Sequence, residues 1–247
     1  MCHPRKDRFD DTGDPVNAVD ASATANHGTI SGALYTGDAG GVTGAAGDFA
    51  LSFEGDTDFV TLDPLKLSSI SANNAVTVSL WIFGVNQPRQ DVAFSLNSGP
   101  TRNVQSHLPW DGNNVYFDTG GCSMPNTRFN GTAPAASLNG AWNHGAFVKS
   151  GNDQQIYVNG NIFLQQTGTS TAPIGAFTQA VIGAASIAGA LSYEGLIDDF
   201  AFFDEGLSQT QIPGIMGGDF SPCLIPEPSS AAQLLMGFFT LRLFRRR

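Results

Sequence analysis

The feature that most constrains the fold is a succession of short β-prone runs separated by clusters of Gly, Asn, Asp and Pro. The runs recur at intervals of roughly 8 to 15 residues, which is typical of an antiparallel sandwich or jelly roll. The first 225 residues contain no sustained 3.6-residue hydrophobic period and no visible internal repeat. The pattern therefore excludes a helical architecture and predicts an all-β fold of two antiparallel sheets.

Local patterns refine this prediction. Residues Val76–Ile82 alternate aliphatic side chains with Thr, Ser and Trp, so one face of a central strand should enter the core. Asn159-Gly160 lies between two β-prone runs and predicts a type I′ hairpin turn, because both residues tolerate positive φ. Only Ser208–Met216 is helix-like, and Pro213 should break it. We expect strands at Gly28–Tyr35, Phe49–Phe53, Phe59–Leu62, Ala75–Phe83, Val92–Leu96, Val115–Asp118, Asn143–Lys149, Gln155–Val158, Ile162–Gln166, Gln179–Ile182 and Leu191–Asp204.

Charge narrows the class of partner. The chain has 247 residues, of which 14 % are charged and 41 % hydrophobic, so it can bury a large core beneath a weakly charged surface. Residues 1–225 hold eight basic and 21 acidic residues. Nucleic-acid binding requires Lys and Arg to neutralise phosphates, so this balance excludes a nucleic-acid partner and suits cation binding better.

The last residues carry a separate signal. Pro226, Glu227 and Pro228 precede an apolar stretch, Ala231–Phe244, which ends in Arg245, Arg246 and Arg247. This arrangement resembles the PEP-CTERM sorting signal of bacterial envelope proteins, which exosortase-type membrane proteases process. The resemblance implies transient membrane insertion of a short hydrophobic helix and export to the cell envelope or beyond. An amphipathic helix docked on the domain is the alternative.

The N-terminal residues do not contain the secretory signal that export to the envelope would require. Met1–Asp20 contains no apolar stretch of the kind that a secretory signal requires. We therefore expect the start codon to be misassigned, with residues 1–8 a short segment, 9–220 the domain and 224–247 the sorting signal. The three cysteines form no metal-binding pattern, and a Cys122–Cys223 disulfide remains open.

Six segments follow one another along the chain in a recognisable order: Val19-Asp20 with Asn26-His27-Gly28, Gly47–Val60, Val76–Ile82, Trp142–Val148, Ile156–Gly160 and Gly195–Ile212. Read in this order, they resemble the LamG-like jelly roll of the concanavalin A-like lectin/glucanase superfamily over about residues 9–217. The resemblance implies a two-sheet fold shared by lectins and glycosidases. Pro88–Pro134 departs from the pattern, and we expect its run from Leu108 to Cys122 to form a loop across one sheet's concave face.

Catalysis would require reactive groups that the sequence does not offer. Retaining glycosidases use two carboxylates about 5 Å apart. The nearest approach to the laminarinase-type Glu-x-Asp-x-x-Glu pattern starts at Glu54 and places Phe59 where the second Glu should lie. Residues 54–58 are better interpreted as an acidic hairpin turn. We therefore expect a non-catalytic module, with a glycoside hydrolase-like enzyme or a purely structural envelope protein as the alternatives.

Two sites are expected. Asp198 and Asp199 lie on a predicted strand, so one carboxylate should turn inward without a nearby Lys or Arg. The family resemblance implies a structural Ca²⁺ held by Asp198 and the carbonyl of Gly47; hydrogen bonding of Asp198 to backbone N–H groups is the alternative. Trp110 and Tyr116 are the candidate ligand-binding residues, stacking on sugar rings or contacting an extracellular protein.

Overall fold

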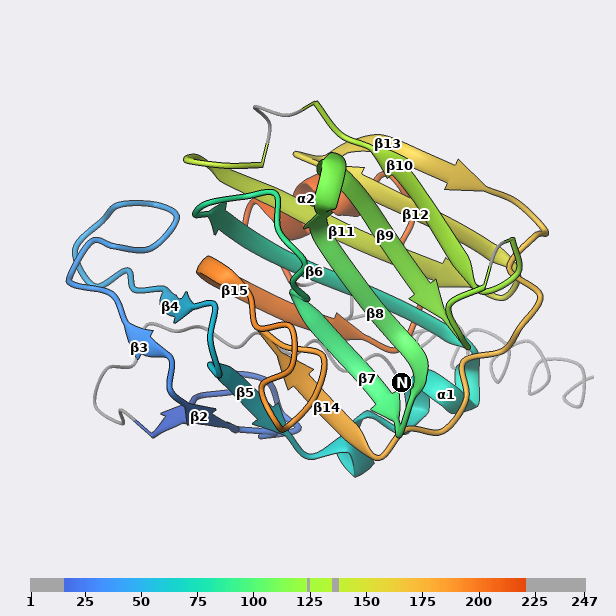
Figure 1. Ribbon diagram of the computed structural model, residues 1–247, viewed down its shortest axis with the longest axis horizontal. Coiled ribbons are helices and arrows are strands. Elements are labelled where there is room, and N and C mark those ends of the chain that lie inside the picture. Colours follow the sequence, from blue (N-terminus) through green and yellow to red (C-terminus); the bar gives the residue numbers. More distant parts are fainter. Residues whose placement is uncertain (1–15, 124, 135–137, 221–247) are drawn as a thin grey trace, which may run out of the picture.

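The computed structural model describes residues 16–123, 125–134 and 138–220, which form two antiparallel sheets packed face to face (Figure 1). The observed architecture confirms the predicted two-sheet sandwich. The eight-stranded sheet contains, in spatial order, β1 (Asn17–Ala18), β2 (Gly28–Ser31), β5 (Phe59–Leu62), β14 (Gln179–Ile182), β7 (Phe94–Ser98), β8 (Thr101–Trp110), β9 (Asn114–Thr119) and β10 (Arg128–Thr132). The seven-stranded sheet contains β13 (Asn161–Gln166), β12 (Asp153–Val158), β11 (Trp142–Ser150), β6 (Ala75–Gly84), β15 (Glu194–Phe203), β4 (Leu51–Glu54) and β3 (Leu34–Tyr35).

The main core lies between the two sheets and is rich in aromatic side chains. Phe94 of β7 makes edge-to-face contacts with Phe147, Phe200 and Phe202 of the opposite sheet, with ring centroids 5.3, 6.1 and 6.3 Å away. All four rings are at most 1 % exposed. Such pairs add to the stabilisation from apolar burial, so these rings hold the two layers at a fixed spacing.

Strand β6 is central, as the alternation predicts. Val76, Val78, Leu80 and Ile82 enter the core, and β11 and β15 flank the strand. The outer face of this sheet is covered by a second apolar cluster that involves α2 (Ile212–Met216). The buried members of this cluster are Ala146, Val148, Tyr157, Ala201, Phe203, Leu207, Ile212 and Ile215. The seven-stranded sheet is therefore apolar on both faces at its centre.

Several local predictions are confirmed or wrong for identifiable reasons. Asn159 and Gly160 have φ values of 49° and 77° and join β12 to β13, which confirms the hairpin. The predicted strand Gly28–Tyr35 divides at Gly32, whose φ of 80° separates β2 from β3. Pro213 lies in the first turn of α2 and does not break it, because a first-turn residue needs no N–H donor.

The expectation that the run from Leu108 to Cys122 forms a loop is wrong, because this run includes the end of β8 and the whole of β9. The longer segment Pro88–Pro134 contributes β7 to β10, which run side by side in one sheet (Figure 1). Residues 54–58 are likewise not a hairpin, because β4 and β5 belong to different sheets. The remaining short helices are η1 (Pro64–Leu67), α1 (Ser69–Asn73) and η2 (Asp111–Asn113).

Some sequence predictions fall outside the described residues. These are the sorting signal at 224–247, the segment 1–8 and the second cysteine of the possible disulfide, Cys223. Cys122, the other cysteine of that pair, is exposed. Within the part of the chain that the structure describes, the helices are all too short or too polar to cross a bilayer.

Candidate ligand site on the outer face of the eight-stranded sheet

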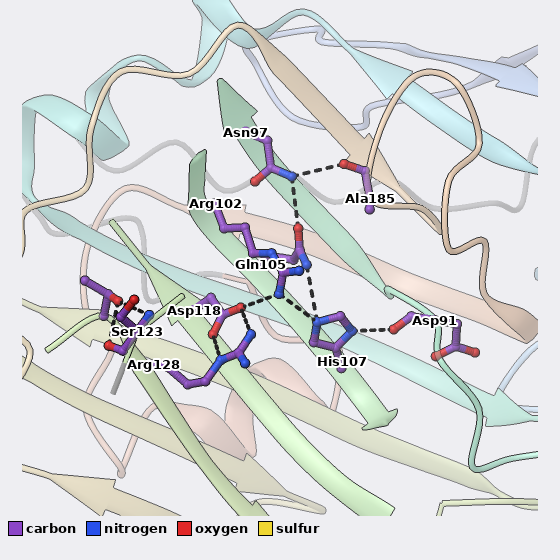
Figure 2. Close-up of polar contacts among 10 residues, drawn as sticks. Asp91, Asn97, Arg102, Gln105, His107, Asp118, Ser123, Arg128 and Ala185 are labelled. Atoms are coloured by element: carbon purple, nitrogen blue, oxygen red, sulfur yellow. Dashed lines mark hydrogen bonds and ion pairs between the residues drawn. The ribbon is translucent and has the colours of Figure 1, made fainter. Parts of the chain in front are cut away.

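Strands β8 and β9 place polar side chains on the outer face because their alternate residues fill the core. Val104 and Val115 point into the core, whereas Gln105 and Tyr116 lie on the opposite face of the same strands. We call the resulting group the outer-face cluster. It comprises Asn97, Arg102, Gln105, His107, Trp110, Tyr116, Asp118 and Arg128. Figure 2 shows its polar members converging from β7, β8, β9 and β10.

Asp118 is the centre of the polar contacts. Its side chain is completely buried, and Arg128 donates from Nε to Oδ1 and from Nη2 to Oδ2, both at 2.7 Å (Figure 2). Arg102 donates from Nη1 to Oδ2 at 2.9 Å. The hydrogen bonds to Asp118 raise the pKa of Arg128. Two guanidinium groups therefore neutralise one buried carboxylate, and the group keeps a net positive charge.

His107 is held as a neutral imidazole. Its Nδ1 lies 2.6 Å from the carbonyl oxygen of Asp91, which can only accept, so Nδ1 carries the hydrogen. Its Nε2 faces two donors, Gln105 Nε2 at 3.3 Å and Arg102 Nη1 at 3.4 Å. Burial lowers the pKa of His107 to about 4. Both ring nitrogens are engaged, so this imidazole positions its neighbours.

The aromatic members lie together at the end of β8. The Trp110 ring is 4.2 Å from the His107 ring and 6.5 Å from the Tyr116 ring, in edge-to-face geometry. Both Trp110 and Tyr116 are partly exposed. The guanidinium of Arg128 lies 4.7 Å from the centre of the Tyr116 ring and covers one of its faces. The structure thus brings the two predicted ligand residues together.

A second line of contacts anchors the cluster to a neighbouring loop. Asn97 Nδ2 donates to Gln105 Oε1 at 2.9 Å and to the carbonyl of Ala185 at 3.0 Å (Figure 2). Asn97 Oδ1 is buried and has no partner among the described residues. The amides of β7 and β8 are therefore fixed in orientation, and one acceptor remains unused.

Sequence reasoning missed the polar members of the cluster: Asn97, Arg102, Gln105, His107, Asp118 and Arg128. A signal was present only in part: Val115 and Phe117 alternate with Tyr116 and Asp118, whereas Ser106 interrupts the apolar positions between Val104 and Leu108. What spacing did not give is the strand register that pairs Asp118 with Arg128 and with Gln105.

Asp91 lies behind His107 and is completely buried. Its Oδ2 accepts a hydrogen bond from Gln87 Nε2 at 2.6 Å, and its Oδ1 has no partner among the described residues. Burial raises the pKa of Asp91 to about 8. At neutral pH this carboxyl is therefore mostly protonated and contributes little charge.

Asp198, the predicted calcium ligand, is 2 % exposed and turned inward. Its Oδ2 accepts from the N–H of Val42 at 2.8 Å and its Oδ1 from the N–H of Asp199 at 2.7 Å. These bonds are the ones that the alternative interpretation predicts. Burial, with the nearby charges of Asp199 and Asp48, raises the pKa of Asp198 to about 7.

The surroundings of Asp198 fit a cation in part. The Asp48 and Asp198 carboxylates both face Gly41, where a Cβ would lie 2.9 Å from Asp198 Oδ2 and in close contact with Asp48 Oδ1. Gly47, the other predicted ligand, has a φ of 83° and donates its N–H to Asp38 Oδ1 at 2.7 Å. Asp20 accepts hydrogen bonds within its own turn, from the N–H groups of Ser22 and Asn26. Among the described residues, no cluster of three or more His, Cys, Asp or Glu could hold a metal.

A hollow of about 190 Å³ lies against the other sheet and its following loop. It is lined by residues that include Asp153, Gln155 and Gly206, and it contains a single acidic side chain. The two-carboxylate arrangement of a glycosidase is therefore not present in this hollow.

The two stacked antiparallel sheets define a lectin-like jelly roll, and comparison with known proteins agrees. The chain belongs to the concanavalin A-like lectin/glucanases superfamily, whose family model matches residues 54–213. A comparison with curated protein sequences gave no match.

Solved structures share this fold at low sequence identity. Domain 4 of AbnA, a GH43 extracellular arabinanase from Geobacillus stearothermophilus in complex with arabinotriose, has a TM-score of 0.62 and 22 % identity over 85 % of this chain and 96 % of that domain. The binding domain of botulinum neurotoxin DC, in complex with rat synaptotagmin II, has a TM-score of 0.65 and 13 % identity over 87 % of this chain and 51 % of that one. Trypanosoma rangeli sialidase has a TM-score of 0.62 and 11 % identity over 88 % of this chain and 33 % of that one. The chain thus spans about half of the neurotoxin domain and a third of the sialidase.

The raised pKa of the buried Asp91 carboxyl predicts that the stability of the folded protein depends on pH. Unfolded Asp ionises near its ordinary pKa of 3.8 and folded Asp91 near 8, so between these values the folded state keeps a proton that the unfolded state has lost. Stability from this group is lost as pH rises, by about 1.4 kcal/mol per unit. We expect Asp91→Asn, which mimics the protonated carboxyl, to gain about 2 to 3 kcal/mol over the natural chain between pH 5 and pH 7.5.

Urea unfolding at a series of pH values measures this gain. The exposed Asp111→Asn variant controls for the loss of one negative charge. A stability difference between Asp91→Asn and the natural chain that stays constant over this range would contradict the prediction.

Proposed function

We propose that this protein is a non-catalytic carbohydrate-binding module that uses the outer-face cluster. The observation that carries the proposal is the pairing of Trp110 and Tyr116 on adjacent strands beside oriented amide and guanidinium donors. Aromatic rings with a few fixed polar groups are the usual means of binding sugars and other ring-shaped ligands. A purely structural role would require no such partly exposed pair of aromatic residues beside fixed donors.

The local chemistry supports binding over catalysis. A glycosidase carboxylate must reach the sugar, whereas Asp118 is fully buried and hydrogen-bonded to two guanidinium groups. His107 engages both of its ring nitrogens, and Asp91 is enclosed. Among related folds, domain 4 of the arabinanase was solved with arabinotriose and the neurotoxin domain with a protein. A glycan is the partner that the aromatic cluster favours here.

We expect Trp110→Ala to weaken glycan binding at least tenfold, because removal of a central aromatic side chain commonly costs this much or more. A glycan array identifies the ligand, and calorimetric titration then measures the affinities. Trp142→Ala is the matched control, since Trp142 packs against Phe83 on the other sheet. Unchanged binding by Trp110→Ala would contradict the assignment of this site, and capture of a protein with no glycan binding would favour the protein-binding alternative.

We also propose a structural Ca²⁺ at Asp198 and Asp48. Ca²⁺ prefers oxygen ligands, and a bound ion would supply positive charge beside the buried Asp198 carboxylate, which accepts from the uncharged backbone N–H groups of Val42 and Asp199. Its role would be to tie the loop before β4 to β15. Gly47 is retained as a candidate ligand through its carbonyl oxygen.

Thermal unfolding in 1 mM Ca²⁺ and in chelator tests this second proposal. We expect Ca²⁺ to raise the unfolding temperature of the natural chain by roughly 5 °C, because a ligand of the folded state stabilises it by mass action. The increase should vanish in Asp198→Asn and persist in Asp153→Asn, a control on β12. Equal unfolding temperatures of the natural chain with and without Ca²⁺ would rule out the ion.

We further propose that residues 224–247 direct the protein to the bacterial envelope and that an exosortase-type protease cleaves within them. The support is the sequence pattern alone: Pro226, Glu227 and Pro228, an apolar stretch, and Arg245–Arg247. Mass spectrometry of the mature protein from envelope fractions should find a new C-terminus close to Pro228. A mature chain that still ends at Arg247 would be incompatible with processing.

A further inference from the structure

The outer-face cluster is a local positive site on an acidic protein. Arg102 of β8 and Arg128 of β10 converge on Asp118 of β9, and their side chains remain 27 % and 23 % exposed. Two positive groups face one negative group. His107 is neutral, since its Nδ1 donates to a carbonyl and its Nε2 faces donors. The formal charge of the whole chain, by contrast, is −10.

The guanidinium groups keep hydrogen-bonding capacity. A guanidinium carries five N–H donors. Arg128 uses Nε and Nη2 on Asp118, and Arg102 uses Nη1 on Asp118 and His107. Because both side chains are partly exposed, their remaining donors can meet a ligand. These groups already hold one carboxylate in the two-pronged geometry that guanidinium and carboxylate prefer.

Two aromatic side chains beside the arginines restrict the orientation of a bound ligand. The Tyr116 ring lies under Arg128, with 4.7 Å between the guanidinium carbon and the ring centre, and this contact fixes the plane of the guanidinium. Trp110 packs beside Tyr116 and His107 and offers an apolar surface next to the charges. A sugar ring stacked on Trp110 would thus bring its substituents close to the arginines.

The charge of the rest of the chain limits how many negative groups a ligand can carry. Electrostatic interactions extend over about 8 Å at physiological ionic strength. A polyanion that crosses the site would bring its further charges close to a chain whose formal net charge is −10, at an unfavourable energy. A ligand with one carboxylate gains the local attraction without this repulsion.

We propose that the outer-face cluster selects saccharides that carry a single carboxylate, such as one uronic acid unit flanked by neutral sugars. This inference rests on the proposed carbohydrate-binding function and names its ligand class. The arginines bind the carboxylate, and Trp110 stacks on an adjoining ring.

Matched oligosaccharide pairs test the inference on the full chain. Each pair differs only in having glucuronate in place of glucose, or galacturonate in place of galactose, at one position. We expect the natural chain to bind the uronate member at least tenfold more tightly in 50 mM salt. The preference should shrink severalfold in 0.5 M salt, because exposed charge pairs are screened.

Arg102→Gln is the informative variant, since Arg128 alone still makes two hydrogen bonds to Asp118. We expect it to reduce the uronate preference to less than threefold, and Arg102→Lys to restore part of it. Arg89→Gln is the matched control, because Arg89 pairs with Glu194 outside the cluster and is 35 % exposed. If a variant fails to fold, the salt dependence of the uronate preference of the natural chain still tests whether charge attraction causes that preference.

The outcomes separate the two proposals. Trp110-dependent binding without a uronate preference would overturn this inference and leave carbohydrate binding standing. Absence of binding to every pair and to every glycan of the array would overturn both. Affinity that rises steadily with the number of carboxylates, or a preference for phosphorylated sugars, would contradict selection for a single carboxylate.

Discussion

The contact of Phe94 with three rings of the opposite sheet is the interaction on which the rest of the structure depends. It fixes how the eight-stranded and seven-stranded sheets lie on each other. Because side chains alternate along a strand, an apolar inner face on β7, β8 and β9 determines which residues must point outward. The position of Gln105, His107 and Asp118 on the outer face therefore follows from the packing of Val104, Leu108 and Phe117 in the core.

The two sheets differ in the side chains that they place on the face turned away from the core. The seven-stranded sheet covers its outer face with an apolar cluster and α2. The eight-stranded sheet instead buries polar groups and pairs them with one another, which is the arrangement required when polar atoms leave water. Paired groups of this kind are fixed in orientation. A fixed set of donors beside aromatic rings is suited to recognising a ligand, and neutral His107 and shielded Asp118 are poorly suited to reacting with one.

The sequence was sufficient for the fold but for only part of the site. The rule of short β-prone runs between turn-forming residues predicted β5 and β14 with the observed bounds, and Asn159-Gly160 predicted a turn, since these signals depend on neighbours in the chain. Strands β8 and β10 were not predicted from the sequence, because polar residues and Gly131 obscure the alternation of apolar side chains along them. The aromatic members of the site were predicted from composition. The arginines were not, because Arg128 and Asp118 become partners only through the register of β9 and β10, and Arg102 joins them only through the pairing of β8 with β9.

The most direct test of the account is the location of a bound sugar. A crystal structure of the chain with a bound oligosaccharide from the array would show it. The account predicts a sugar ring on Trp110, across the outer face of β8 and β9, with polar contacts to Arg102 or Arg128. A sugar ordered elsewhere, such as in the hollow beside Gly206, with the outer-face cluster empty, would contradict it.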